Sequence, residues 1–164
     1  MYVAERLADH HQLDRFDSGQ PGLDDWRRRH ARTADAKRIG RTYVWHRGDD
    51  IVLAYFTLCP HVLVRAELPT KLGRGDPMRI PAILLARLVL NRTLHGQRLG
   101  AQLLLDALCR AVAASNDVGG RYVVVEVIDE PAARFYEHHN FHRCPGTSPI
   151  RLIRRVTDIA ATLG

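Results

Sequence analysis

The chain has 164 residues, 46% of them hydrophobic, and its 24 lysines and arginines against 18 aspartates and glutamates give a net charge of +6. This length suits one globular domain with a core and a cleft, and no run reaches the roughly 18 to 20 apolar residues that span a bilayer. The three cysteines lack C-x-x-C spacing and indicate neither a disulfide framework nor a zinc knuckle, so we expect a soluble cytoplasmic protein whose charge attracts polyanions.

The first part of the chain predicts a strand, a helix and a hairpin. A short strand is expected over residues 2–7, and the turn signals after Phe16 lead into a helix over residues 23–37 that stops near Gly40. The segments RTYVWH and IVLAYFTLC then contain many β-branched and aromatic residues, with the polar RGDD between them. We predict an antiparallel pair of strands joined by a turn there.

The second part is more regular after one irregular stretch. Several glycines and prolines predict a loop over residues 60–81. The run IPAILLARLVL from Ile80 has the composition of a strand buried on both faces, although its length also suits a helix. The later predicted elements are an amphipathic helix over residues 99–115, a buried strand over residues 121–127, a helix from Asp129 or Glu130 to about His139, and short closing strands with a last helical turn.

A predicted strand ending at Asn91, the loop HGQRLG from His95 and the helix after it form an anion site by simple electrostatics. The first backbone N–H groups of a helix are unpaired and together carry roughly half a positive charge. A pyrophosphate would fit there. An ordinary loop entering a helix is the alternative, because a short glycine-containing loop is weak evidence by itself.

The segments around this loop resemble a known family. The stretch RLVLNRTLHGQRLGAQLLLDAL resembles the coenzyme A motif of the GNAT N-acetyltransferases, and RYVVVEVIDEPAARFYEHHNF resembles the strand and helix that follow it. Upstream, FDSGQPGLDDWRRRHA, RTYVW and IPAILLARLVL resemble the GNAT toxins of type II toxin-antitoxin systems, which acetylate the amino acid on charged tRNA. The resemblance covers nearly the whole chain.

The resemblance implies a single GNAT domain over residues 1–164, of the α+β (α/β) class. Its central sheet would be mixed, mostly antiparallel and twisted, with flanking helices and with coenzyme A bound at the splayed central strands. Acetyl-CoA is the implied co-substrate, without a metal. The residues at the family's cofactor-binding positions are Leu88, Val89, Leu90, His95, Gly96, Gln97, Arg98, Leu99, Gly100, Ala101, Asp129, Ala132 and Phe135.

The loop departs from the family pattern in two places. The family has Gln or Arg first, then two residues, Gly, one residue, and Gly or Ala; here His95 stands first, Arg98 replaces the first Gly, and Gly100 matches. Because the loop binds phosphate through backbone N–H groups, Arg98 can add a charge-assisted contact if its backbone avoids a conformation that only Gly adopts. Asn140 replaces the Gly of Phe-Tyr-x-x-x-Gly-Phe, and Asn tolerates a left-handed helix terminus.

Acetyl transfer from a thioester to an amine requires a neutral amine, donors to the oxyanion and a proton for the thiolate. The resemblance assigns the oxyanion donor to the backbone N–H of Leu90 and the proton to Tyr136, whose phenol is protonated at neutral pH. Phe135 and Tyr136 point about 100° apart on one helix, so one can enter the core, and we assign Tyr136 to the cleft. A packing role for Tyr136 is the alternative. No general base stands out, and water suffices if the ester-linked amine is weakly basic.

Basic residues are dense around the first helix. Asp24 and Asp25 are the acidic residues close by, so most of these charges lack an i, i+4 partner. A solvated helix face is the plain interpretation, and we favour binding of tRNA phosphates. The predicted tRNA-binding residues are Arg27, Arg28, Arg32, Lys37, Arg38, Arg79 and Arg92.

The histidine-rich HHNFH does not predict a metal site. Asn140 and Phe141 interrupt the helical spacing that two histidine ligands would need. We therefore expect no bound metal.

The predicted function is transfer of an acetyl group from acetyl-CoA to the α-amine of an aminoacyl-tRNA, which blocks translation. The resemblance also implies a cognate ribbon-helix-helix antitoxin and a toxin homodimer, with no membrane association. A GNAT acetyltransferase of a protein or small-molecule amine is one alternative, although the charge of +6 disfavours cationic acceptors. The other is a non-catalytic module, in which the altered loop binds coenzyme A weakly and the basic face binds nucleic acid or a partner protein.

Overall fold

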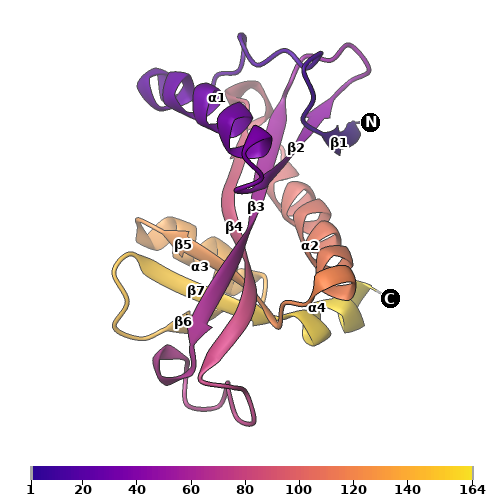
Figure 1. Cartoon of the computed structure of the whole chain (residues 1–164). Coiled ribbons are helices and arrows are strands. Elements are labelled where there is room, and N and C mark those ends of the chain that lie inside the picture. Colours follow the sequence, from indigo (N-terminus) through magenta and orange to yellow (C-terminus); the bar gives the residue numbers. More distant parts are fainter. Residues whose placement is uncertain (1, 164) are drawn as a thin grey trace. The chain divides into compact units, whose positions relative to one another are not determined.

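The computed structural model describes residues 2–163, without the side chains of residues 21–23 and 25–28. Figure 1 labels its helices and strands. The strands are β1 (Val3–Arg6), β2 (Arg41–His46), β3 (Ala54–Val64), β4 (Arg79–Leu90), β5 (Tyr122–Val127), β6 (His142–Cys144) and β7 (Ile150–Arg155). The helices are α1 (Pro21–Ala36), α2 (Leu99–Val118), α3 (Glu130–His138) and α4 (Val156–Leu163), with the 3-10 turns η1 (Arg65–Glu67) and η2 (Arg92–Leu94). None of the helices in this described part is long and apolar enough to span a bilayer.

The strands form a mixed sheet in the order β1-β2-β3-β4-β5-β7-β6. The pairs β1 with β2, β2 with β3, β5 with β7 and β6 with β7 are antiparallel. The pair of β4 with β5 is parallel, with Ala82 opposite Tyr122 and Leu84 opposite Val124. The predicted mixed, mostly antiparallel sheet is therefore confirmed.

The strand β3 is longer than the sequence predicts. We expected a loop over residues 60–81, but β3 continues through Pro60 to Val64 and β4 begins at Arg79. A proline lacks the N–H that a ladder needs and commonly marks a strand end, which is why the prediction stopped there. Beyond Pro60 the side chains alternate as in a strand, because Val62 and Val64 are exposed while Leu63 is buried.

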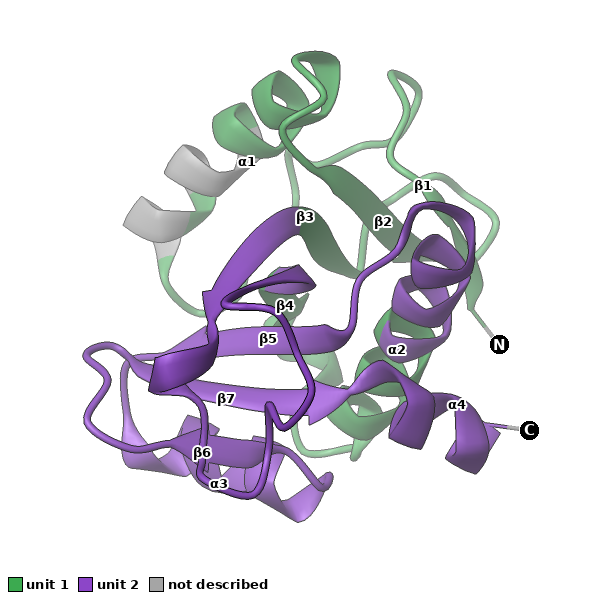
Figure 2. Cartoon of the chain, turned by 60° about the horizontal axis from the view of Figure 1, so that its bottom comes forward, with its two compact units in different colours: residues 1–59, 86–107 green, residues 60–85, 108–164 purple. Residues whose placement is uncertain are grey.

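The chain folds into two compact units (Figure 2). The first has residues 1–59 and 86–107, and the second has residues 60–85 and 108–164. The elements β3, β4 and α2 contribute residues to both units, so neither unit is a separable piece of the chain. The single domain over residues 1–164 stays a prediction.

Each unit has its own apolar core. The core of the first consists of Leu7, Leu13, Phe16, Val44, Val52 and Tyr55, with Ala31 and Val89 packed against it. The core of the second contains Leu63, Leu68, Ile80, Ala82, Tyr122, Val124, Cys144 and Ile153. The end of β4 and the helix α1 are thus anchored in the first core through Val89 and Ala31.

Glu5 ties the four-residue edge strand β1 to its surroundings in the first unit. Its Oε1 accepts hydrogen bonds from Nε2 of His11 at 2.8 Å and from Nε2 of His46 at 2.7 Å. The Nε2 atoms carry the protons, because Nδ1 of His11 accepts from the N–H of Ala8 and Nδ1 of His46 accepts from the N–H of Gly48. The hydrogen bonds from the two histidines lower the pKa of Glu5 from 4.5 to about 2.

The Glu5 carboxylate stabilises the folded chain only while it is ionised. Since folding lowers its pKa, its contribution is complete above pH 4.5 and is lost as the pH falls towards 2. We expect the free energy of unfolding to fall more steeply for the wild type than for Glu5→Gln over this interval. Urea unfolding at several pH values measures the difference, with Asp9→Asn, at an exposed carboxylate, as the control that keeps the wild-type slope. Parallel curves for the wild type and Glu5→Gln would contradict the assignment.

Candidate active site

The turn between β4 and α2 contains the strand, loop and helix that the sequence predicts. β4 ends at Leu90 and α2 begins at Leu99. After Leu90, the buried Asn91 fixes the turn, because its Oδ1 accepts from the N–H of Thr93 at 3.1 Å and from the Thr93 hydroxyl at 3.0 Å. The first N–H groups of α2 therefore follow a turn that holds its own shape, and a helix start of this kind stabilises an anion.

Two side chains of the predicted phosphate loop bind backbone carbonyls that precede it in the chain. Nε2 of His95 lies 3.2 Å from the carbonyl oxygen of Leu90 and donates to it. Nε2 of Gln97 donates to the carbonyl oxygen of Thr93 at 3.1 Å. Residues 95–98 are otherwise exposed, so the outer side of the loop is open to a ligand.

Arg98 lies in the left-handed region of backbone space with a φ of 58°, and Gly96 has a φ of 78°. L-residues enter this region at a cost of about 1 to 2 kcal/mol. Arg98 therefore stands where the family has glycine, and its backbone is strained there. Its φ nevertheless lies in a region that residues with side chains can adopt. Asn140 also lies there, with a φ of 68°, which confirms the predicted left-handed terminus after α3.

The segment from Leu88 to Leu90 is half-buried at the end of β4. Side chains alternate along a strand, and Val89 packs against the first core, so Leu88 and Leu90 point to the opposite face. The first turn of α2 follows with Gly100 and Ala101, both half-buried. The roles predicted for Leu88, Val89, Leu90 and Ala101 depend on backbone groups and stay predictions.

The predicted cofactor-binding residues of α3 belong to the second unit. The carboxylate of Asp129 caps the helix by accepting from the N–H of Ala132 at 2.9 Å, so these two groups already bind each other. Phe135 is half-buried, and its ring contacts that of His139 with 4.9 Å between centroids.

Tyr136 is more buried than Phe135 within this unit, and its assignment to the cleft stays a prediction. Its side chain is 8% exposed and packs edge-on against Phe141, with 5.4 Å between ring centroids. The left-handed Asn140 returns the chain towards α3, where the N–H of Phe141 donates to the carbonyl of Tyr136 at 3.1 Å. Burial raises the pKa of the Tyr136 phenol, so the phenol keeps its proton at neutral pH. Its catalytic role stays a prediction.

Four of the predicted tRNA-binding residues are exposed, namely Lys37, Arg38, Arg79 and Arg92. Lys37 and Arg38 follow the end of α1, and Arg79 begins β4 in the second unit. Arg27 and Arg28 lie outside the described side chains.

Two of the predicted tRNA-binding residues, Arg32 and the exposed Arg92, have partners that sequence reasoning missed. Arg32 donates from Nη1 and Nη2 to the carbonyls of Ala8 and His11 at 3.1 and 2.6 Å, which braces α1 against the preceding loop. Nε of Arg92 lies 3.0 Å from the carboxylate of Asp17 in an ion pair. These partners are distant in the chain, so no local pattern announces them.

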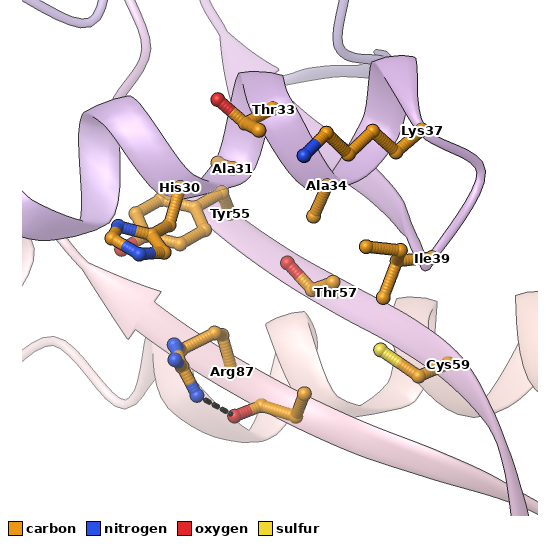
Figure 3. Close-up of a pocket in the computed structure, with 11 residues that line it drawn as sticks. His30, Ala31, Thr33, Ala34, Lys37, Ile39, Tyr55, Thr57, Cys59 and Arg87 are labelled. Atoms are coloured by element: carbon orange, nitrogen blue, oxygen red, sulfur yellow. Dashed lines mark hydrogen bonds between the residues drawn. The ribbon is translucent and has the colours of Figure 1, made fainter.

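A cavity of about 420 Å³, which we call the α1 cavity, lies in the first unit between α1, β3 and β4 (Figure 3). Its wall includes Arg87 of β4 together with Lys37, which follows α1. Arg87 was not among the predicted site residues. The sequence signal that could have found it is a lone charge inside the apolar run IPAILLARLVL.

Glu5, His11, His46 and Asp50 bring potential ligand atoms within 4.8 Å of one another, the one such group found in the described part of the chain. A metal would need the lone pair of each histidine Nε2. Each Nε2 carries a proton and donates it in a hydrogen bond to Glu5, because each Nδ1 accepts a hydrogen bond from a backbone N–H. The tautomers oppose metal binding, and the group acts as the hydrogen-bond tie of β1.

Known proteins resemble this chain over nearly its whole length, although no family model matches it. The chain is 33% identical over 159 residues to a tRNA-acetylating toxin of Mycobacterium tuberculosis, which covers 97% of this chain and 95% of that protein. It is similar to the structure of AtaT complexed with acetyl-methionyl-tRNAfMet, with a TM-score of 0.90, 30% identity and 100% of both chains covered. It is also similar to a tyrosine-to-phenylalanine mutant of AtaT bound to the C-terminus of the antitoxin AtaR and acetyl-CoA, with a TM-score of 0.84, 29% identity, and 99% and 98% of the two chains covered.

The strain at Arg98 gives a test of the loop geometry. We expect Arg98→Gly to have a free energy of unfolding about 1 kcal/mol higher than Arg98→Ala, because both variants lose the same charge and alanine alone keeps the left-handed strain. Urea unfolding measures this difference. At the exposed Gln102 within α2 the order should reverse, with Gln102→Gly about 1 kcal/mol less stable than Gln102→Ala. A glycine that destabilises at both positions would refute the left-handed conformation of Arg98.

Proposed function

The chain belongs to the family of tRNA-acetylating toxins, which are acetyl-CoA-dependent N-acetyltransferases of the GNAT type, and we propose how its own residues carry out the reaction. The reaction moves the acetyl group to the α-amine of an aminoacyl-tRNA and so blocks translation. The observation that carries the residue assignments is the turn from β4 to α2. It presents a helix start, a turn held by its own side chains and the exposed Arg98.

The donor set of this turn fits the phosphates of coenzyme A. The unpaired N–H groups at the start of α2 favour a pyrophosphate, and Arg98 adds a charge-assisted contact from an exposed position. His95 and Gln97 would hold the loop rather than the ligand, because His95 already binds the carbonyl of Leu90 at the end of β4 and Gln97 binds that of Thr93. When bound, acetyl-CoA supplies the acetyl thioester.

Two groups of the chain are proposed to act on the reacting atoms. The backbone N–H of Leu90 would stabilise negative charge on the thioester oxygen. Tyr136 would give its proton to the departing thiolate. Burial raises the pKa of the Tyr136 phenol. Removal from water would also raise the pKa of the coenzyme A thiol. Because both pKa values shift in the same direction, burial does not by itself oppose proton transfer from the phenol to the thiolate. The ester-linked amine is weakly basic, and water would take its proton.

The tRNA is proposed to bind along the exposed basic residues. Lys37, Arg38 and Arg79 are exposed and suited to phosphate contacts. We also propose Arg27 and Arg28 of α1 as tRNA contacts, and this part of the proposal rests on the sequence alone. Arg32 would act by keeping α1 in place, and Arg92 would have to share its guanidinium with Asp17.

We further propose a cognate antitoxin of the ribbon-helix-helix class, a toxin homodimer and action in the cytoplasm. The AtaT structure that holds the C-terminus of its antitoxin AtaR supports the antitoxin. The class of antitoxin and the homodimer rest on the family resemblance of the sequence, and action in the cytoplasm agrees with a structural relative that binds tRNA.

The proposed function is tested by incubating the protein with labelled acetyl-CoA and a pool of charged tRNAs. Uncharged tRNA and free amino acids are the controls. We expect label on the aminoacyl group of charged tRNA alone. Label on free amines would favour a different acceptor, and no label on any of them would favour a non-catalytic module.

The role of Tyr136 is tested by Tyr136→Phe in the same assay. Loss of the proton donor should lower turnover by about 10² to 10⁴ while the dissociation constant of acetyl-CoA stays unchanged. Tyr2→Phe is the matched control, because it removes a phenol hydroxyl from a ring that stacks on Trp45 in the first unit. Near-normal turnover of Tyr136→Phe would assign this residue to packing.

The role of the basic residues is tested by the salt dependence of tRNA binding. Arg38→Gln should weaken binding to all tRNAs alike and reduce the slope of log K against log salt concentration by about 1. Arg74→Gln removes another exposed arginine, outside the proposed surface, and should leave the slope unchanged. Equal slopes for wild type and Arg38→Gln would remove Arg38 from the tRNA surface.

A further inference from the structure

The α1 cavity opens beside the strand segment that leads to Leu90. Arg87 in its wall precedes Leu90 by three residues on β4, which is about 10 Å along a strand. The cavity, the end of β4 and the turn into α2 all belong to the first unit. Its volume of about 420 Å³ falls in the range of roughly 300 to 1,000 Å³ typical of pockets that enclose a small molecule.

Most of the cavity wall is apolar (Figure 3). Ala31 and Ala34 of α1, Ile39 after it and the ring of Tyr55 on β3 contribute this surface. The hydroxyl of Thr57, also in the wall, is already engaged in a hydrogen bond of 2.9 Å with that of Thr42. The wall thus offers contact area to an apolar group and few polar partners to a polar one.

The charged groups of the wall are cations. Lys37 is exposed, and Nη1 of Arg87 donates to the carbonyl of Ala86 at 2.8 Å, which holds the guanidinium against its own strand. Among the described residues that line the cavity, none is acidic. A cationic side chain that entered the cavity would meet two like charges, and no carboxylate among the described lining residues would balance it.

We propose that the α1 cavity binds the amino-acid side chain of the aminoacyl-tRNA and selects uncharged, apolar side chains, with Lys37 and Arg87 excluding cationic ones. The inference rests on the proposed function, since it concerns the acceptor of that reaction. A lysyl or arginyl side chain would give up water beside two cations. An aspartyl or glutamyl side chain would bury its carboxylate against the apolar wall, and the desolvation offsets the attraction.

The selectivity is measured as kcat/KM for acetylation of purified isoleucyl-, glycyl-, aspartyl- and lysyl-tRNA. We expect isoleucyl-tRNA to exceed lysyl-tRNA and aspartyl-tRNA by at least about tenfold. A preference for aspartyl-tRNA or lysyl-tRNA would overturn the inference. Failure of the wild type to acetylate any charged tRNA would instead refute the proposed function itself.

The role of the two cations is tested by the double substitution Lys37→Met and Arg87→Met. The ratio of kcat/KM for lysyl-tRNA to that for isoleucyl-tRNA should rise about tenfold. Arg29→Met is the control, because Arg29 is exposed on α1 but does not line the cavity. Its loss should change kcat/KM by the same factor for all charged tRNAs. A ratio equal to that of the wild type in an active double variant would overturn the exclusion.

A second variant tests the cavity by volume rather than charge. Ala34→Leu on α1 fills part of the cavity from a half-buried position. Acetylation of isoleucyl-tRNA should fall at least about tenfold, while glycyl-tRNA, which brings no side chain, should change by less than about threefold. Equal effects on the two tRNAs would place the side chain elsewhere. If Ala34→Leu does not fold, the double variant decides between the two outcomes on its own.

Discussion

Between Leu90 and Leu99 the chain leaves a strand and enters a helix whose first N–H groups have no partner inside the helix. These N–H groups can bind an anion only if the preceding loop neither covers the start of the helix nor accepts their hydrogen bonds itself. Asn91 and His95 meet this requirement by bonding within the turn, to Thr93 and to the strand end. The position of the cavity follows from the same strand, because Val89 fixes β4 in the first core and thereby sets which side of the strand Arg87 takes.

Some basic side chains are neutralised by nearby carboxylates, whereas others are exposed to solvent. In the second unit, Arg143 pairs with Glu130 and Glu137, and Arg151 pairs with Glu67 and Glu126. Pairs of this kind on the surface add little stability, but they cancel charge locally. Around the end of α1 the cations are exposed, and no ion pair of Lys37 or Arg38 is found among the described residues. Part of the excess of +6 is therefore displayed where a polyanion is proposed to bind.

Local patterns predicted the parts of the fold that depend on neighbours in the sequence. The strand from Ile80, the helix from Leu99 and the left-handed Asn140 each follow from residues within a few positions, because periodicity and backbone preference act at that range. The end of β3 did not follow, since Pro60 is tolerated only where the strand leaves it exposed.

The candidate site was harder to predict than the fold, because side chains choose partners that are far away in the chain. Arg32 and Arg92 look like free cations in the sequence, yet they bind the loop over residues 8–17. The burial of Tyr136 depends on Phe141 returning after a turn. The cavity beside Arg87 exists only where α1, β3 and β4 meet, and no segment of sequence contains it.

The strained residue in the phosphate loop also bears on how the loop can change by mutation. Every arginine codon is a single base change away from a glycine codon, so the relaxed loop is always within reach of one mutation from Arg98. That step would release roughly 1 kcal/mol of strain and remove a positive charge at the same time. Arginine at this position lowers folding stability through backbone strain and raises phosphate affinity through its charge. We expect selection to keep the arginine only while the gain in phosphate affinity outweighs the loss of folding stability.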